Sequence, residues 1–348
     1  MQPPVRVLVV DDSAFLRKVV SQMLARSPGV EVVATARDGE EALERVEEHH
    51  PDVVTLDLMM PGMGGVGFLR EQMKRRPIPV VVCSIAHESG ELALAALEAG
   101  AVDFVQKPTA LANERVFEMA DELVAKVTAA AGVSLSRIVA PAPLPAAGIA
   151  ESPRPAAPGA VDVVAIGIST GGPQALRYLI PQLPEDFPVP LAVVLHMPVG
   201  YTEMYAKRLD EISRLRVVEA REGDEIRAGT VYLAPAGIHL GFARDGDGTV
   251  RAHLDVRPLD TPHRPAVDVL FGSAAETYGA RVLGVVMTGM GQDGLLGAAH
   301  VKAQGGRVIT EAESSCVVYG MPRAVVEAAL SDRTVTLEQM AASIMEMV

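Results

Sequence analysis

One stretch of the chain, residues 161–173, places a strand, a tight turn and the start of a helix in direct succession. Residues 161–168 are mainly apolar and rich in β-branched side chains, which is typical of a buried strand. Glycines then interrupt the pattern, and Pro173 suits the first position of a helix. Parallel α/β sheets are built from such units, and this one places Ser169 at a sharp corner.

The corner at Ser169 indicates a nucleophile. The N–H groups of a helix N-terminus favour negative charge, including the oxyanion of a tetrahedral intermediate. Residues 167–171 also fit the G-x-S-x-G pattern of serine nucleophiles. A glycine-rich turn or a phosphate cradle fits the same residues. The dinucleotide fingerprint G-x-G-x-x-G does not, because its second glycine is replaced by Ser169.

Composition narrows the class of protein. A chain of 348 residues predicts two domains, and 49% apolar residues support ordinary cores. The net charge of −13, the absence of Trp and the 4% aromatic content argue against nucleic-acid binding. Two distant cysteines, Cys83 and Cys316, are typical of a reducing compartment. With neither a signal peptide nor an apolar run of membrane length, we expect a cytoplasmic protein without membrane insertion.

The first 130 residues alternate between strand and helix patterns. Strands are predicted at 5–10, 31–36, 53–56, 79–83 and 102–105, and helices after Ser13 and at 39–48, 91–99 and 108–130. This alternation predicts a five-stranded, doubly wound parallel sheet that binds ligands at the carboxyl ends of its strands.

Polar residues follow several of these strands, namely Asp11, Asp12, Asp57, Ser84 and Lys107. Three carboxylates that converge at one sheet edge repel one another unless a cation lies among them, and Mg²⁺ prefers oxygen ligands. A lysine beside them neutralises further charge. The alternative is that the carboxylates only cap helices.

The composition changes after residue 130. Residues 140–160 are mostly Ala and Pro, with six prolines, which predicts a semi-extended linker. We therefore predict a first domain at 1–130, a linker at 131–160 and a second domain at 161–348.

The second domain also shows an α/β pattern with a mostly parallel sheet. Strands are predicted from 161 and at 191–195, 217–218, 230–233, 281–287 and 307–310, with helices at 267–278 and 295–303. Residues 237–240 and 250–254 predict a β-excursion that turns at Asp245-Gly246.

Three strand ends of this domain carry the residues of a nucleophilic triad. Ser169 supplies a hydroxyl, His196 a base and Asp293 a carboxylate that orients the base. The backbone amides of Met290 and Thr170 are candidate oxyanion donors. The order Ser, His, Asp differs from that of α/β-hydrolases, so we expect a different scaffold.

Other residues compete for these roles. His239 and His253 lie in the predicted β-excursion and are expected at the surface. His263 lies in a proline-rich loop that can line a binding site, and His300 lies within a helix. Cys316 is a possible thiol nucleophile, but no helix start follows it, so we expect a buried apolar side chain.

Over residues 4–125 the chain resembles the response-regulator receiver domain, through the five polar residues at the strand ends. The resemblance implies a flavodoxin-like fold and phosphorylation of Asp57 by a histidine kinase. It also implies Mg²⁺ in a pocket of Asp11, Asp12 and Asp57, with Ser84 as switch hydroxyl and Lys107 on the acyl phosphate.

The chain departs from the receiver pattern at Gly64, where such domains usually carry Asp. A looser loop is expected there. The departure bears on the lifetime of the phosphoryl group and leaves phosphorylation itself expected.

Five motifs of the second domain resemble the chemotaxis protein-glutamate methylesterases of the CheB type: residues 167–172 (GISTGG), 196–198 (HMP), 263–271 (HRPAVDVLF), 288–294 (TGMGQDG) and 315–323 (SCVVYGMPR). The resemblance implies Ser169, His196 and Asp293 as the triad. The implied activity is hydrolysis of glutamate γ-methyl esters on chemoreceptors with release of methanol, and deamidation of receptor glutamines. Phosphorylation of the receiver is expected to activate the esterase by shifting the receiver away from an open cleft.

Two other functions remain open from the sequence. The second domain can be a binding module in which the glycines only pack a turn, or a DNA-binding output domain. The net charge of −13 and the lack of a basic helix-turn-helix disfavour the second of these.

Overall fold

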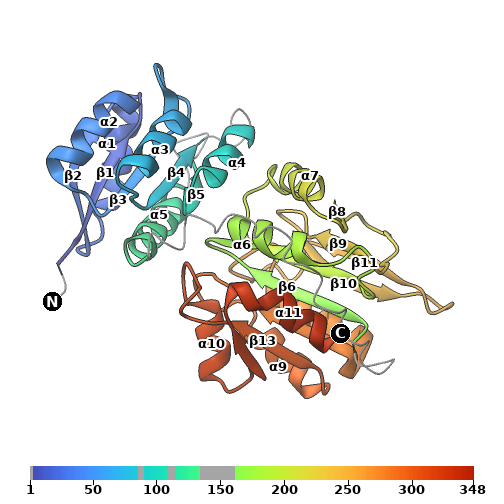
Figure 1. The fold of residues 1–348 in the computed structure, drawn as a ribbon. Helices are drawn as coiled ribbons and strands as arrows, with labels where there is room; N and C mark the ends of the chain where they lie inside the picture. Colours follow the sequence, from blue (N-terminus) through green and yellow to red (C-terminus); the bar gives the residue numbers. More distant parts are fainter. Residues whose placement is uncertain (1–2, 85–89, 108–114, 134–160) are drawn as a thin grey trace. The chain divides into compact units, whose positions relative to one another are not determined.

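The structure is a computed structural model that describes residues 3–84, 90–107, 115–133 and 161–348. The chain divides into two compact units, Met1–Val139 and Ala140–Val348 (Figure 1). Most of the predicted linker, residues 134–160, and the predicted helix start at 108–114 lie outside the described residues.

The N-terminal unit contains a five-stranded parallel sheet in the order β2-β1-β3-β4-β5. Helices α1 and α5 pack together on one face, and α2, α3 and α4 form a row on the other. The doubly wound fold expected from the sequence is confirmed. The elements are β1 (Val5–Val10), α1 (Ala14–Leu24), β2 (Val30–Ala36), α2 (Gly39–His49), β3 (Val53–Leu56), α3 (Gly64–Arg75), β4 (Val80–Ser84), α4 (Gly90–Glu98), β5 (Asp103–Gln106) and α5 (Arg115–Ala131).

Helix α3 was not predicted, because its first turn is rich in glycine, a poor helix former. Packing explains the glycine at one of these positions. A Cβ on Gly65 would lie 2.3 Å from the carbonyl oxygen of Asp57, so only glycine lets the helix approach the end of β3 this closely.

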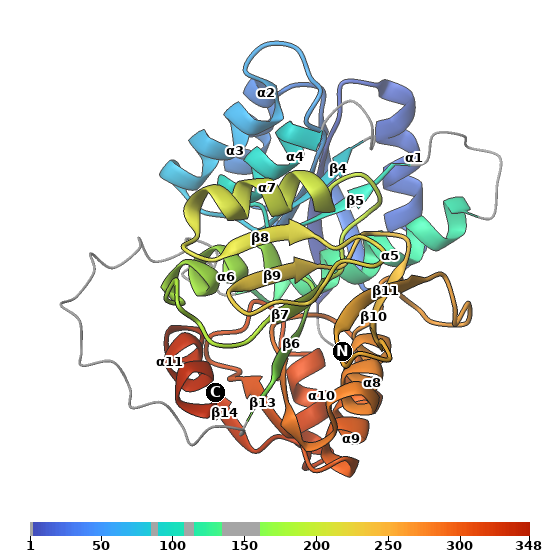
Figure 2. The ribbon, with the colours of Figure 1, turned by 90° about the vertical axis from the view of Figure 1, so that its right-hand side faces the viewer.

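The C-terminal unit contains a seven-stranded parallel sheet in the order β14-β13-β12-β6-β7-β9-β8. Figure 2 shows its strands following one another, with the antiparallel hairpin of β10 and β11 beside α8. The strands are β6 (Val163–Ile168), β7 (Leu191–Leu195), β8 (Arg216–Glu219), β9 (Thr230–Leu233), β10 (His239–Arg244), β11 (Val250–Asp255), β12 (Val282–Val286), β13 (Arg307–Glu311) and β14 (Arg333–Val335).

Helices cover both faces of this sheet. Helices α8, α9 and α10 pack in succession on one face, and α7, α6 and α11 on the other. Two short 3₁₀ helices, η2 (Ile180–Gln182) and η3 (Gly279–Arg281), follow α6 and α8. The α-helices are α6 (Gly172–Leu179), α7 (Thr202–Ile212), α8 (Val267–Tyr278), α9 (Leu295–Ala303), α10 (Met321–Glu327) and α11 (Leu337–Met347).

The β-excursion is confirmed as a hairpin, but its loop is longer than predicted. Asp245 N–H donates to the carbonyl of Thr249 at 2.8 Å, and Gly248 N–H donates to that of Asp245 at 3.0 Å. The loop therefore needs more residues than the predicted Asp245-Gly246 turn. Among the described residues, no helix combines the length and apolarity that a membrane span requires.

Candidate active site

Ser169 lies where β6 ends and α6 begins, as the sequence predicts. Its N–H donates to the carbonyl of Thr288 at 2.9 Å, and its carbonyl accepts from Gly172 N–H at 2.7 Å. Gly171 between them has φ +78°, and a Cβ there would lie 2.6 Å from that of Val317. Positive φ and lack of space both require glycine, and the resulting turn leaves Ser169 half-buried at the corner.

The loop after β12 is tied to this corner by Thr288. Its buried hydroxyl donates to the carbonyl of Thr170 at 2.9 Å and accepts from Val318 N–H at 3.0 Å. The next residue, Gly289, packs so closely that a Cβ on it would lie 2.8 Å from the Cβ of Ser169. Three segments that are distant in sequence thus fix the position of Ser169.

His196 follows β7 and pairs with Asp293. The imidazole Nε2 lies 2.9 Å from Oδ2 of the carboxylate, and both side chains are only 9% exposed. Because a carboxylate only accepts, Nε2 carries the proton and Nδ1 the free lone pair. Within the described part of the chain, the buried Nδ1 has no hydrogen-bond partner, so the structure joins His196 to Asp293 but forms no bond from His196 to Ser169.

Asp293 also closes the N-terminus of α8. Its carboxylate accepts from Val267 N–H at 2.8 Å and from Asp268 N–H at 2.9 Å. Asp268 does the same for α9, accepting from Gly294 N–H at 2.9 Å and Gly297 N–H at 2.7 Å. The two carboxylates thus cap each other's neighbouring helix, a relation that was not predicted from the sequence.

Burial and hydrogen bonding act in opposite directions on these two carboxyls. Burial raises the pKa of Asp293, but the bond to His196 and the two amides outweigh it and leave the pKa below its usual value. Burial raises the pKa of Asp268, with the charge of Asp293 adding to the effect. Asp293 is therefore the ionised partner that can stabilise an imidazolium at His196.

The two predicted oxyanion donors belong to segments that adjoin Ser169. Thr170 follows it directly and is buried. Met290 follows Gly289 and is half-buried. In the described part of the chain, Met290 N–H donates to no protein acceptor, as expected for a donor kept for a ligand.

The other histidines and Cys316 divide into confirmed and corrected expectations. His253 is exposed, His300 lies in α9, and Cys316 is buried, all as expected. The prediction that His239 lies at the surface is wrong, because it is 1% exposed. The sequence shows that β10 is a strand, but not that this face of the hairpin packs against α8.

His263 lies directly against the candidate base. Its ring stacks on that of His196, with centroids 4.0 Å apart and an interplanar angle of 25°. The proline-rich loop that carries it was expected to line a binding site, but the stacking itself was not predicted.

The predicted polar cluster of the N-terminal unit also comes together. Lys107 Nζ lies 2.5 Å from Oδ2 of Asp11 and 3.0 Å from Oδ1 of Asp57, and all three residues are buried. Asp12 is exposed beside them, and the three aspartates offer oxygen atoms within 4.8 Å of one another. Ser84 is buried at the end of β4, where its carbonyl accepts from Lys107 N–H at 2.8 Å.

Charge balance in this cluster depends on Lys107. Burial raises the pKa of Asp57 and outweighs the lowering effect of Lys107. Burial lowers the pKa of Lys107, but Asp57 and Asp11 reverse this and leave it raised. Two carboxylates and one ammonium leave a net negative charge, so these residues fit a divalent cation with oxygen ligands.

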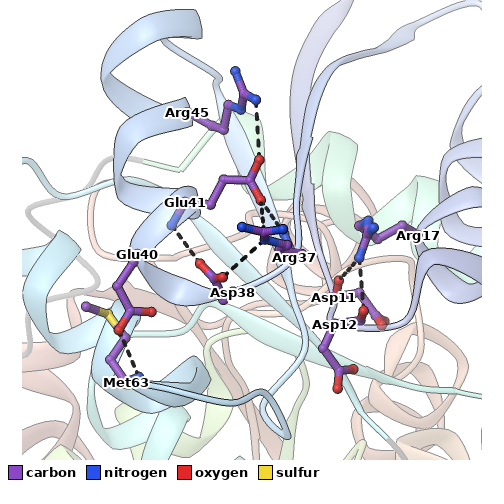
Figure 3. Close-up of polar contacts among 9 residues, drawn as sticks. All are labelled: Asp11, Asp12, Arg17, Arg37, Asp38, Glu40, Glu41, Arg45 and Met63. Atoms are coloured by element: carbon purple, nitrogen blue, oxygen red, sulfur yellow. Dashed lines mark hydrogen bonds and ion pairs between the residues drawn. The ribbon is translucent and has the colours of Figure 1, made fainter.

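Two further contacts shape the loops around the cluster (Figure 3). Arg17 donates to the carbonyls of Asp11 at 2.7 Å and Asp12 at 3.1 Å, holding the loop after β1. Glu40, from α2, accepts from Met63 N–H at 3.2 Å. This bond reaches the loop after β3, just before Gly64, where the sequence led us to expect a looser structure.

Comparison with known proteins agrees with this arrangement. The family model "CheB methylesterase" matches residues 164–344, and the model "Response regulator receiver domain" matches residues 7–118. A protein-glutamate methylesterase/protein-glutamine glutaminase of Myxococcus xanthus is 55% identical over 340 residues, 97% of each chain. One from Geobacillus kaustophilus is 43% identical over 351 residues, 99% of each chain.

A solved structure supports the C-terminal fold. The crystal structure of the Thermotoga maritima CheB methylesterase catalytic domain is 44% identical, with a TM-score of 0.53, over 54% of this chain and 99% of that one. The fold and the matches thus define a response regulator with an enzymatic output unit. The chain belongs to the CheB methylesterase family, which confirms the resemblance noted in the sequence.

Proposed function

We propose that this chain is a phosphorylation-activated serine hydrolase that removes methyl groups from glutamate γ-methyl esters on methyl-accepting chemotaxis receptors. Deamidation of receptor glutamines is its second activity, and sensory adaptation is its role. The observation that carries the proposal is the pair of His196 and Asp293 beside the Ser169 corner, inside the segment that matches the methylesterase family. The relatives' names give both activities.

The roles in the proposed triad follow from which nitrogen of His196 already has a hydrogen-bond partner. Asp293 holds Nε2 of His196, so Nδ1 is the atom that accepts the Ser169 proton. The serine oxygen attacks the ester carbonyl, and the amides of Met290 and Thr170 stabilise the oxyanion. The imidazolium then returns the proton to the leaving methanol. Water hydrolyses the acyl-enzyme by the same proton route, and an amide substrate releases ammonia instead.

The bond between Ser169 and His196 forms in this proposal only when substrate is bound. Catalytic hydrogen bonds are often long before binding and tighten in the Michaelis complex. The free, buried Nδ1 supports this reading, since a buried acceptor without a partner costs free energy until it is paired.

The N-terminal unit acts as the regulatory domain, with boundaries at 1–130, a linker at 131–160 and the catalytic domain at 161–348. A chemotaxis histidine kinase supplies the phosphoryl group to Asp57. Asp11, Asp12 and Asp57 would hold Mg²⁺, which would neutralise charge on the phosphoryl group. Ser84 and Lys107 then contact the acyl phosphate. We place the protein in the cytoplasm, where receptor signalling regions are accessible.

Methanol release from methylated receptor membranes tests the proposal on the full chain, with and without a small-molecule phosphodonor. Ser169→Ala is expected to lose about 10⁴-fold or more in rate while remaining folded, whereas Cys316→Ala keeps activity. Asp57→Ala keeps basal turnover and loses the response to the phosphodonor. Full activity in Ser169→Ala together with its loss in Cys316→Ala would assign the nucleophile to the thiol instead.

A further inference from the structure

The loop between β11 and α8 is fixed at both ends by one buried side chain, His239 of β10. Its Nε2 lies 3.1 Å from the carbonyl oxygen of Pro258, near the start of the loop. Its Nδ1 accepts from Ala266 N–H at 3.1 Å, at the end of the loop. Since a carbonyl only accepts and an amide N–H only donates, this imidazole is neutral with its proton on Nε2.

His263 lies between these two anchor points and covers one face of His196. The loop has further ties on either side of it. Gly237 N–H donates to the carbonyl of Arg264 at 2.9 Å, and Arg264 donates to the carbonyl of Leu259 at 3.2 Å. The stacking ring is therefore carried by a segment whose backbone is held in place, although the ring itself is exposed.

The candidate base needs such a contact. His196 has one side-chain hydrogen bond, from Nε2 to Asp293, and none at Nδ1 within the described residues. A single bond leaves the ring free to turn about that bond, and the second side-chain torsion of histidine has only a broad preference. A stacked neighbour restricts this turning, because it fixes the plane of the ring.

The same anchor also reaches the acid of the triad. Ala266 is the N-cap residue of α8, and the next two amides of that helix hold Asp293. His239 thus contacts both the segment that carries the stacking ring and the helix start whose amides hold the Asp293 carboxylate.

We propose that His263, carried on the loop that His239 anchors, is a positioning residue that holds the His196 imidazole in its reactive plane. The inference rests on the proposed function, since it assigns His196 the role of base. It predicts that the flat ring of His263 is required and its ionisable nitrogens are not.

Kinetics of methanol release by the full chain, with Mg²⁺ and a phosphodonor, test the inference. His263→Ala is expected to lower kcat about 10- to 100-fold with KM within about twofold, because misplaced catalytic groups slow the reaction step. His263→Phe keeps a flat ring and is expected to recover most of the rate. His263→Leu fills space without a flat face and resembles the alanine variant, which keeps the test valid if alanine destabilises the loop. His253→Ala, at an exposed histidine of β11, is the matched control.

Each outcome bears on the inference. Wild-type kcat in His263→Ala, a change in KM alone, or equal loss in the phenylalanine and alanine variants would overturn it. A readout independent of activity is the NMR signal of the His196 ring protons. This signal is expected to shift when His263→Ala removes the neighbouring ring, and to stay in place in His253→Ala. An inactive wild type with this shift present would overturn the proposed function while retaining the stack.

Discussion

Gly289→Ala is the substitution by which the geometry around Ser169 is most directly tested. A Cβ at this position would lie 2.8 Å from the Cβ of Ser169 and 2.3 Å from Sδ of Met321, where ordinary contacts begin at 3.4 Å. The methionine can move its flexible end. Relief of the contact with Ser169 requires the serine itself to shift and to disturb the bond from its N–H to Thr288, so we expect this candidate nucleophile to be displaced by several tenths of an ångström.

Catalysis is sensitive to displacements of this size. A misplacement of about 1 Å can cost about 10²-fold in rate, so we expect Gly289→Ala to lower kcat about 10- to 100-fold. The measurement is methanol release per active chain, with a thermal melt to confirm that the protein is folded. Gly246→Ala is the matched control, since a Cβ there meets nothing within 4 Å. Full activity in a folded Gly289→Ala variant would refute the argument that this glycine sets the position of Ser169.

Three further predictions concern buried charged and titratable groups. Burial lowers the pKa of His239, so the unfolded chain binds a proton that the folded chain does not, and stability falls as pH drops below 6.5, by at most about 1.4 kcal/mol per unit. Glu311 is fully buried and accepts from Thr288 N–H at 2.9 Å, so Glu311→Ala is expected to cost about 2–4 kcal/mol and Glu311→Gln much less. Lys107→Met leaves Asp11 and Asp57 unpaired and is expected to cost about 3–5 kcal/mol in EDTA, with part restored by Mg²⁺.

Urea unfolding of the full chain, followed separately for each unit, measures the free energy of unfolding on which all three predictions depend. The pH effect should shrink in His239→Gln, and an unchanged slope would show that another group is responsible. Equal stability of the two Glu311 variants would contradict the role of its hydrogen bonds. For Lys107→Met, a loss that Mg²⁺ does not reduce would argue against a cation among the aspartates.

Much of the fold could be predicted because the spacing of apolar residues distinguishes strands from helices in segments that are long enough to show a repeat. The strands at 53–56 and 191–195 and the helix at 267–278 agree with β3, β7 and α8 to the residue. The last three elements, α10, β14 and α11, were not predicted. Strand β14 has only three residues, too few for a periodic pattern, and it is defined by its pairing with β13.

The sequence was sufficient to predict which residues form the candidate site. It was not sufficient to predict the hydrogen bonds and contacts that join them. Strand ends show where Ser169 and His196 emerge, because the carboxyl ends of parallel strands meet at one edge. Asp293 was expected directly after a strand, but β12 ends at Val286 and Asp293 lies in the loop that leads into α9. Which imidazole nitrogen faces the carboxylate depends on side-chain torsions, which no sequence pattern gives. The burial of His239 and the stacking of His263 depend on how the hairpin and the following loop pack against the rest of the unit.

The exchange of caps between Asp293 and Asp268 makes the acid of the proposed triad part of the helix framework. The amides it holds belong to the first turn of α8, and its own chain segment leads into α9, whose amides Asp268 holds. Releasing the carboxylate therefore requires fraying of these two helix starts together. Heat inactivation is then expected to follow the cooperative melting of the C-terminal unit, without an earlier loss from a loosened loop, and the amide protons of Val267 and Gly297 should exchange with solvent at similarly slow rates.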